Sequence, residues 1–250
     1  MRAFAVFLFT IPLLAGALSD PRPAGKPPAN EGFALVELFT SEGCSSCPPA
    51  DRLLDRLGKE FAHQPVYLLS YHVDYWDHLG WKDAYSDPAF TKRQREYAAS
   101  LHAQSVYTPQ VVVNGRTELV GSNEKGVRAA LRQYLGTPAP AELEMEGRLT
   151  DDRRVKLTYR TRGQQPARLL LAFARREVQT RVGRGENGGK TLLHRNVVGK
   201  LVPLRLSGEG TGEAVVPLPA GFAPADWELI AFLQHPETGA VLAGKRVVVP

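Results

Sequence analysis

The sequence predicts an α/β domain followed by an antiparallel β-sandwich domain. Up to about residue 135, short apolar runs alternate with segments of helical period, whereas beyond residue 142 strand-like alternating runs dominate. Both cysteines of the chain, Cys44 and Cys47, stand where the first apolar run gives way to the first helical segment. This order predicts a mixed sheet with helices on both faces, joined to a sandwich of about the usual domain size.

The first three elements surround the cysteine pair. Residues 33–40 and 66–73 are short apolar runs without helical period, which predicts two buried strands. Between them, a helix is expected to begin near Cys47, because apolar residues recur there at three- and four-residue steps. These residues are Leu53, Leu54, Leu57 and Phe61.

A second helix, a hairpin and a third helix are expected next. Asp87 is the expected N-cap and Pro88 the first helical residue of a helix that runs to about residue 103. Asn114 and Gly115 lie between two strand-like runs and predict a tight hairpin. The third helix is expected to end at Gly136. A right-handed crossover should join the first two strands.

The segment 136–142, GTPAPAE, marks a change of composition and is interpreted as a domain boundary. We therefore divide the chain into a first domain at 33–137 and a β-rich sandwich domain at 138–250. Strand-like runs such as RRVKLTYR, ARLLLAFARR and WELIAFLQH, separated by Gly, Pro and Asp turns, support the second domain.

The N-terminal segment is typical of an export signal. Arg2 precedes an apolar run at 3–14 and small residues at 15–17, which predicts a signal peptide over 1–17. The run is shorter than the roughly 20 residues that a membrane-spanning helix needs. A Pro-rich linker at 18–32 follows. The mature chain is expected to have no membrane span and to be periplasmic or extracellular, where disulfides persist.

Charge and cysteine content narrow the functional classes. The net charge is +5, and the basic residues are scattered among acids, so no nucleic-acid footprint is expected. A chain of 250 residues buries enough apolar surface to need no disulfide staple. A bridge between Cys44 and Cys47 would close too short a loop to restrict the unfolded chain much. The pair is therefore better explained by reactivity than by stability.

A C-x-x-C pair at the start of a helix has a defined redox chemistry. Unpaired N–H groups and the helix dipole stabilise an anion there, so Cys44 is the expected exposed nucleophile. Cys47 lies one turn further on, where it can attack a mixed disulfide and release the product. A zinc site would need two more strong ligands, and the chain has no second thiol pair.

Several motifs carry a resemblance to known proteins. The element order, the CSSC motif and Thr108-Pro109 before the hairpin resemble the thioredoxin superfamily, which implies a thioredoxin-like fold over 33–137 and a cis-proline, Pro109, facing the cysteines. More narrowly, residues 31–250 resemble a family of exported bacterial proteins of unknown function with a thioredoxin-like domain and a β-rich C-terminal region. The motifs are VELFTSEGCSSCPPAD, YHVDYWDHLGWKD, YTPQVVVNG and GENGGKTLLHRNVVGKL.

The chain departs from ordinary thioredoxins in two places. Gly43 replaces the aromatic residue usual before the first cysteine. Cys44 and Pro109 are also far apart in the sequence, and the added length is expected in the loop around DYWDHLGWKDAYSD. We expect this loop to cover the site or to select a partner.

Three carboxylates near the cysteines need an explanation. Glu37 stands inside an apolar strand, and burying a carboxylate is unfavourable unless it is used or paired. It resembles the buried acid that shuttles protons to the second cysteine of thioredoxins, or else it points to a polar partner elsewhere. Glu42 and Asp51 bring negative charge near the thiols and oppose ionisation of Cys44, although Asp51 also favours the helix dipole.

Other candidate sites are weaker. His72, Asp74 and His78 are conceivable metal ligands, and a copper-handling site would combine the two thiols with His72 or His102, but a strand end with loop caps explains these residues equally well. We therefore assign no metal and no cofactor. The glycine-rich segment 183–189, GRGENGG, is interpreted as a flexible loop because no helix follows it.

The first functional hypothesis is an exported thiol-disulfide oxidoreductase in which Cys44 and Cys47 cycle between dithiol and disulfide, with Pro109 and Glu37 as further site residues. Its partner would be a thiol or disulfide of a protein substrate. The alternative is a thioredoxin-like binding or metal-handling protein without redox turnover.

Overall fold

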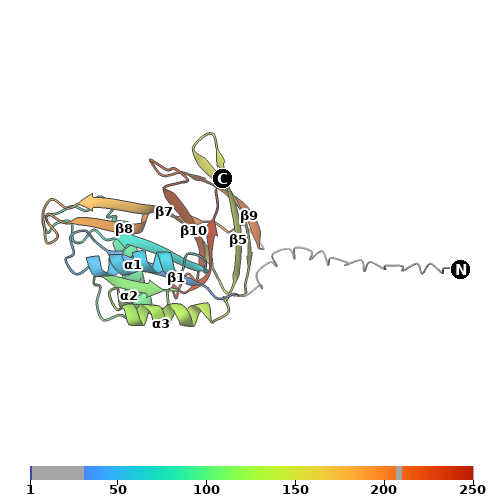
Figure 1. Ribbon diagram of the computed structural model, residues 1–250, viewed down its shortest axis with the longest axis horizontal. Coiled ribbons are helices and arrows are strands. Elements are labelled where there is room, and N and C mark those ends of the chain that lie inside the picture. The colour runs from blue at the N-terminus through green and yellow to red at the C-terminus, as the bar shows by residue number, and fades with distance from the viewer. Residues whose placement is uncertain (2–30, 207–209, 250) are drawn as a thin grey trace.

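The computed structural model describes Met1, residues 31–206 and residues 210–249. Apart from Met1, the expected signal peptide lies outside these residues, as does nearly all of the expected linker. The described part is a mixed α/β structure with one eight-stranded sheet and one three-stranded antiparallel sheet. In Figure 1 the three helices gather around β1 on one side, and β5 and β9 of the small sheet lie on the other.

The elements of the first half follow the predicted order. Asp87 caps the second helix by accepting a hydrogen bond from the Ala89 amide, and Asn114 and Gly115 form the hairpin turn with positive φ angles of 50° and 60°. These predictions are confirmed. The elements are β1 (Ala34–Thr40), α1 (Pro48–Glu60), β2 (Val66–His72), α2 (Pro88–Ser100), β3 (Gln110–Val113), β4 (Thr117–Val120) and α3 (Glu124–Leu135).

The second half consists of antiparallel strands, but they are shared between two sheets. The strands are β5 (Glu142–Thr150), β6 (Arg154–Arg162), β7 (Arg168–Arg181), β8 (Thr191–Leu204), β9 (Thr211–Pro217), β10 (Trp227–Gln234) and β11 (Val241–Val247). Strands β5, β6 and β9 form the small sheet. The other four extend the large sheet, whose order is β11-β10-β7-β8-β2-β1-β3-β4.

A separate β-sandwich is therefore not confirmed, because β8 pairs with β2 through Ser70 and Val197. The physical reason is that β2 would otherwise present an unpaired edge, and alternation in the sequence does not say which edge a strand will join. The large sheet continues across residues 137 and 138, while the division into two domains stays a prediction.

Strand β10 and residues 169–174 of β7 are buried on both faces, which explains their nearly continuous apolar runs. On β7, Leu169, Leu171 and Phe173 belong to the core formed with the small sheet. Leu170 and Ala172, which point the other way, belong to a second core shared with α2 and with the strands β1 and β2. A third core packs α1 and α3 against β1, β2 and β3. Side-chain alternation along a strand thus divides the apolar residues between layers.

The large sheet bends strongly around the second core. A Cβ atom at Gly244 of β11 would lie 2.8 Å from the Tyr67 ring of β2, although three strands separate β11 from β2 in the sheet order. Only glycine permits this close approach. The bend brings β11 against the beginning of β1 and β2, where a Cβ atom at Gly244 would also lie 3.2 Å from the Phe33 ring.

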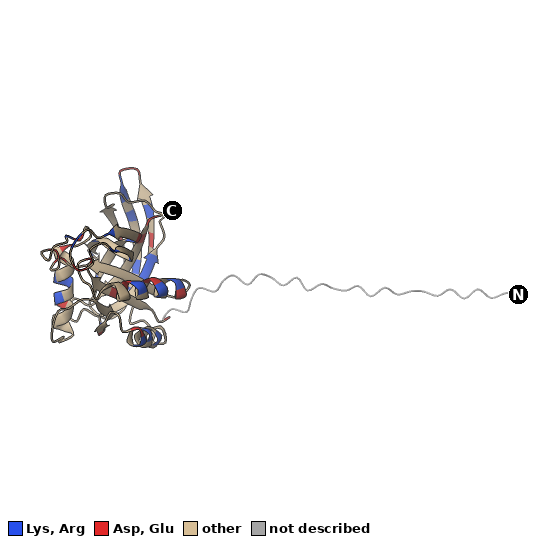
Figure 2. Ribbon diagram, turned by 60° about the vertical axis from the view of Figure 1, so that its left-hand side comes forward, with Lys and Arg blue, Asp and Glu red and all other residues tan. Residues whose placement is uncertain are grey.

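The surface charge is mixed. On the helices in Figure 2, basic and acidic residues lie beside one another, and pairs such as Lys59 with Asp55 are joined by ion pairs. Among the described residues, no helix is both long and apolar enough to cross a membrane.

Candidate functional site

The site begins where β1 ends. Cys44 and Cys47 form a disulfide with a Cα to Cα distance of 5.4 Å, and Cys47 is the N-cap of α1. Pro48 occupies the first helical position, which suits its fixed φ and its missing N–H group. The serine at position 46 lies 3.3 Å from the Cys44 sulfur through its hydroxyl. The expected position of the cysteine pair at a strand-to-helix junction is confirmed.

Both cysteines are fully buried, with 0% of each residue exposed. This corrects the expectation that Cys44 is the exposed thiol. The intervening Ser45 and Ser46 are exposed instead. The position of the cysteines at a helix start is a local feature of the sequence. Their exposure depends on segments distant in the sequence that pack over them.

One covering segment is the glycine-rich loop at 183–189. The Asn187 side-chain amide donates hydrogen bonds to the carbonyl oxygens of Glu42 and Cys44, at 2.9 and 2.8 Å. Asn187 is fully buried. On the exposed side of the loop, the Glu186 carboxylate accepts a hydrogen bond from the Ser45 amide at 3.0 Å. Hydrogen bonding to the Ser45 side chain, and then to its amide, lowers the pKa of Glu186.

The interpretation of residues 183–189 as a merely flexible loop was therefore wrong. The loop is anchored to the turn that carries the disulfide, more than 140 residues away in the sequence. Sequence reasoning missed this anchor because an Asn between glycines is typical of many turns.

The second covering segment is the Trp-rich loop that follows β2. The Trp76 indole N–H donates to the Thr108 hydroxyl at 2.8 Å, and the Trp81 indole N–H donates to the Glu42 carboxylate at 2.7 Å. A Cβ atom at Gly43 would approach the Trp76 Cβ to 3.1 Å, so a larger residue before Cys44 would crowd this loop. The loop covers the site, which is one of the two roles expected for it from the sequence, the other being selection of a partner.

Pro109 lies on a third side. The Thr108–Pro109 peptide bond is cis, as expected. The Ser46 hydroxyl is 3.5 Å from the Thr108 carbonyl oxygen, which places the peptide before the proline beside the CSSC turn.

Beneath the turn lies a cluster of five buried ionisable side chains, which we call the histidine–acid cluster: Glu42, Asp51, His72, Asp83 and His194. His72 Nδ1 is 2.7 Å from Asp83 Oδ2, His194 Nδ1 is 3.5 Å from Asp51 Oδ1, and the two imidazole centroids are 4.7 Å apart. Three elements contribute: α1 provides Asp51, β2 provides His72 and β8 provides His194.

The charges in this cluster depend on one another. Complete burial lowers the pKa of His72, but the charge and hydrogen bond of Asp83 outweigh burial and raise it overall, with smaller contributions from Asp51 and Glu42. Burial raises the pKa of Asp83, but His72 and backbone hydrogen bonds lower it overall. His72 and Asp83 therefore stabilise each other as an ion pair.

The cluster is incompletely satisfied. Within the described part of the chain, His72 Nε2, Glu42 Oε1 and both ring nitrogens of His194 are buried without a hydrogen-bond partner. The 3.5 Å approach of His194 Nδ1 to Asp51 is an ion-pair distance without hydrogen-bond geometry. Most buried polar atoms in proteins are paired, so a group of unpaired ones beside a disulfide indicates a functional site.

Glu37 does not belong to this cluster. Its carboxylate accepts hydrogen bonds from Arg93 Nη2 at 2.7 and 3.0 Å and from the Tyr71 hydroxyl at 3.2 Å. Arg93 lies on α2, which packs on the other face of β1 from α1. The structure therefore favours the interpretation of Glu37 as a residue with a polar partner elsewhere, and not as a proton acceptor under the cysteines.

The candidate metal ligands named from the sequence do not lie together either. His72 is paired with Asp83, Asp74 accepts a hydrogen bond from Thr91, and both His78 and His102 are exposed. Among the described residues, no group of three His, Cys, Asp or Glu side chains has the arrangement of a metal site.

Fold and site together define a mixed α/β protein with a CSSC disulfide at the start of a helix, covered by loops from both halves of the chain. The chain belongs to the family DUF1223, described as a protein of unknown function, whose profile matches residues 35–234. None of the curated proteins matches it.

A solved structure is similar over nearly the whole described chain. The X-ray structure of a protein from Agrobacterium tumefaciens, a structural genomics target, has 26% sequence identity and a TM-score of 0.70. The similarity covers 88% of this chain and 96% of the other.

Proposed function

We propose that this protein is an exported thiol-disulfide oxidoreductase in which residues 33–137 form a thioredoxin-like unit and Cys44 and Cys47 are the redox pair. The observation that carries the proposal is the disulfide at the start of α1, beside the cis Thr108–Pro109 peptide and above buried His and Glu side chains that have atoms without hydrogen-bond partners. The export signal expected at 1–17 supports a compartment in which such a disulfide is maintained.

The proposed reaction transfers two electrons between the CSSC pair and a protein substrate. The Cys44 thiolate attacks a substrate disulfide, one substrate sulfur leaves as a thiolate, and a mixed disulfide forms. Cys47 loses its proton and attacks the Cys44 sulfur, which releases the second substrate thiolate and restores the Cys44–Cys47 disulfide. The substrate is reduced and the protein is oxidised, and the reverse sequence of steps oxidises a substrate dithiol.

The local environment supports this division of roles. The Ser46 hydroxyl, 3.3 Å from the Cys44 sulfur, is a hydrogen-bond donor available to a thiolate, and the start of α1 adds its dipole. Negative charge on Glu42 and Asp51 opposes ionisation. We therefore expect a modestly lowered pKa for the Cys44 thiol.

We assign to Asp51, together with His194, the proton-accepting role that the sequence suggested for Glu37. The Asp51 amide donates to the Cys47 carbonyl oxygen at 3.2 Å, so the Asp51 side chain begins one helical turn after Cys47. Its carboxylate also accepts a hydrogen bond from the Thr40 hydroxyl at 3.2 Å. In the proposed mechanism Asp51 and His194 accept the Cys47 proton in the second step.

Because both cysteines are buried, the proposed turnover requires the covering loops to move. The loop at 183–189 is the better candidate, because it is joined to the CSSC turn by side-chain hydrogen bonds that can break without disrupting a strand. Glu186 accepts one from the Ser45 amide, and Asn187 donates two. Gly185 and Gly189 of this loop have positive φ angles of 75° and 80°, which residues with a Cβ atom rarely adopt.

Full burial of both sulfurs also supports the alternative, a binding protein whose disulfide is structural and never turns over. Equilibration with glutathione buffers of graded potential separates the two functions. The oxidoreductase should gain and lose both thiols reversibly without unfolding, as counted by alkylation and mass spectrometry. A pair that is reduced only on unfolding would support the binding protein.

Trapping variants test the assignment of roles. Cys47→Ser should accumulate mixed disulfides with protein substrates, because the second attack is missing, whereas Cys44→Ser should trap almost nothing. Equal trapping by the two variants would contradict Cys44 as the nucleophile.

A further inference from the structure

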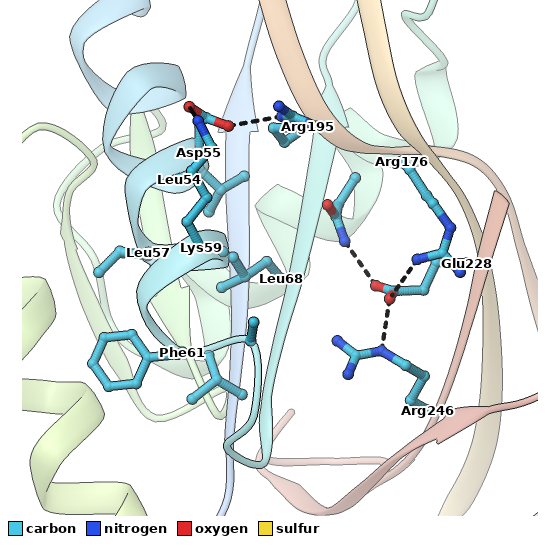
Figure 3. A pocket seen from close by; sticks show the side chains of 14 residues that line it. Leu54, Asp55, Leu57, Lys59, Phe61, Leu68, Arg176, Arg195, Glu228 and Arg246 are labelled. Atoms are coloured by element: carbon cyan, nitrogen blue, oxygen red, sulfur yellow. Dashed lines mark hydrogen bonds and ion pairs between the residues drawn. The ribbon is translucent and has the colours of Figure 1, made fainter. Parts of the chain in front are cut away.

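A pocket of about 380 Å³ lies at the far end of α1 from the disulfide (Figure 3). It opens where β2 and β8 separate: they pair at Ser70 and Val197, but Val66 and Leu68 of β2 face Arg195 and Asn196 of β8 across the cavity. Asn196 has a positive φ of 51°, which redirects β8 at this point. The pocket is therefore a consequence of how the two halves of the chain join.

One wall of the pocket carries a fixed arrangement of cations. Arg176 and Arg246 both donate to the Glu228 carboxylate, at 3.3 and 2.6 Å, and the Asn196 side-chain amide donates to its other oxygen at 2.7 Å. The Glu228 side chain is 4% exposed, whereas those of Arg176 and Arg246 are 49% and 40% exposed. One buried carboxylate thus orients two guanidinium groups and neutralises only one of them.

The surplus charge faces the cavity. Arg246 uses its Nε atom for Glu228, and its two terminal nitrogens have no hydrogen-bond partner among the described residues. In Figure 3 these nitrogens point away from Glu228 and toward the side of the pocket where Leu68 and Phe61 lie. A planar guanidinium with two free N–H edges matches the geometry of a carboxylate.

The opposite wall is apolar except for Asp55 and Lys59, which are paired with each other while Asp55 also pairs with Arg195. It includes a glycine that packing does not require. Leu54, Phe61 and Leu68 contribute side chains from α1, the turn after it and β2. Gly58 lies inside α1, where glycine is less favourable than alanine. A Cβ atom there would meet only the Leu68 side chain, at an ordinary contact distance of 3.4 Å. The absence of a larger side chain at Gly58 keeps the pocket open.

We propose that this pocket binds an organic carboxylate, with the carboxylate on Arg246 and Arg176 and the apolar body on Leu54, Phe61 and Leu68. Charge alone would attract any small anion, and an apolar wall alone would attract any lipid-like molecule. The combination selects molecules that have both parts. This site is separate from the disulfide and does not depend on the proposed redox function.

Calorimetric titration with octanoate tests the proposal, with acetate and octanol as probes that each lack one part. Octanoate should bind at least about tenfold more tightly than either, because charge-assisted hydrogen bonds and apolar burial both contribute. Comparable affinity for octanol and octanoate, or no octanoate binding, would overturn the proposal.

Two pairs of variants locate the binding. Arg246→Gln should weaken octanoate binding by about tenfold or more, because a charge-assisted pair is lost. Arg52→Gln, an exposed arginine of α1 outside the pocket, should leave it unchanged. Gly58→Leu should abolish binding by filling the cavity, whereas Gly58→Ala should retain it.

The Gly58 pair remains decisive if Arg246→Gln fails to fold, because neither Gly58 variant touches the ion pairs of Glu228. Octanoate binding that survives in Gly58→Leu would place the ligand elsewhere and overturn the proposal.

Discussion

Glu37 and Asp51 are both buried acids close to the CSSC turn in sequence, yet their surroundings differ. The Glu37 carboxylate is held by Arg93 and Tyr71, and Arg93 in turn contacts Tyr97 and Gln234 through hydrogen bonds. Asp51 accepts a hydrogen bond from the Thr40 hydroxyl, and the His194 imidazole, 3.5 Å from Asp51, has no hydrogen-bond partner on either ring nitrogen.

The difference separates structure from chemistry. A buried charge with a complete set of partners holds two elements together, here β1 and α2. A buried charge with an incomplete set retains the capacity to accept a proton. Burial of an acid in an apolar strand is therefore insufficient to identify a catalytic group, and the count of its partners is more informative.

Removal of the Glu37 partner should produce the largest effect on stability. Arg93→Met should lower the free energy of unfolding by roughly 3–5 kcal/mol, because it leaves a buried carboxylate unpaired. Urea denaturation followed by circular dichroism measures the change. Arg52→Met, at an exposed position of α1, is the control and should change stability by less than about 0.5 kcal/mol. A small loss in Arg93→Met would show that the Glu37 network is not structural.

Neutralising Asp51 should act on the reaction more than on the fold. Asp51→Asn should slow release of the mixed disulfide by about 100-fold, within the usual range for loss of a general base, and leave the first attack by Cys44 nearly unchanged. Rapid-mixing kinetics with a disulfide substrate resolve the two steps.

Glu37→Gln is the matched control for Asp51→Asn, because it neutralises the other buried acid. In the folded protein it should leave both steps nearly unchanged, although it removes the carboxylate partner of buried Arg93 and should therefore lower stability. If Glu37→Gln slows release and Asp51→Asn does not, the roles of the two acids are reversed.

Loosening the 183–189 loop that covers the disulfide should have a smaller effect, on the rate at which the disulfide is reduced. Asn187→Ala removes two hydrogen bonds between the 183–189 loop and the CSSC turn, each of about 1 kcal/mol, and should speed reduction of the disulfide by a phosphine roughly 30-fold. Glu186→Gln, which alters only an exposed contact, should change the rate much less. Equal rates for Asn187→Ala and the unmodified protein would show that another segment controls access.

The ion pair in the histidine–acid cluster should make stability depend on pH. The pKa of His72 is raised by folding, so its contribution is complete below about pH 6.5 and is lost as pH rises through the folded value. The pKa of Asp83 is lowered, so its contribution is complete above about pH 3.9 and is lost as pH falls through its folded value.

The pair should therefore contribute most between roughly pH 4 and pH 6.5. Urea midpoints measured across this range and above it test the prediction. Asp83→Asn should flatten the decline on the alkaline side, and an unchanged decline in this variant would assign it to another group.

Local features of the sequence were sufficient for most of the first half. The N-cap at Asp87, the hairpin at Asn114-Gly115 and the helix after the cysteines depend on residues close together in the chain, and all three were predicted correctly. The cis peptide before Pro109 followed from a resemblance confined to a short motif. The position of the disulfide at the start of α1 has the same local origin.

Contacts between distant segments decided the rest. Alternation along β1 predicts that Glu37 and Leu38 point to opposite faces, but which face receives α2 and its Arg93 depends on how the helices pack. The pairing of β8 with β2 brings His194, and the loop before β8 with Asn187, to cysteines about 140 residues away. A β-strand can pair with any open edge whose register buries its apolar face, so this choice is made only when the whole core is assembled.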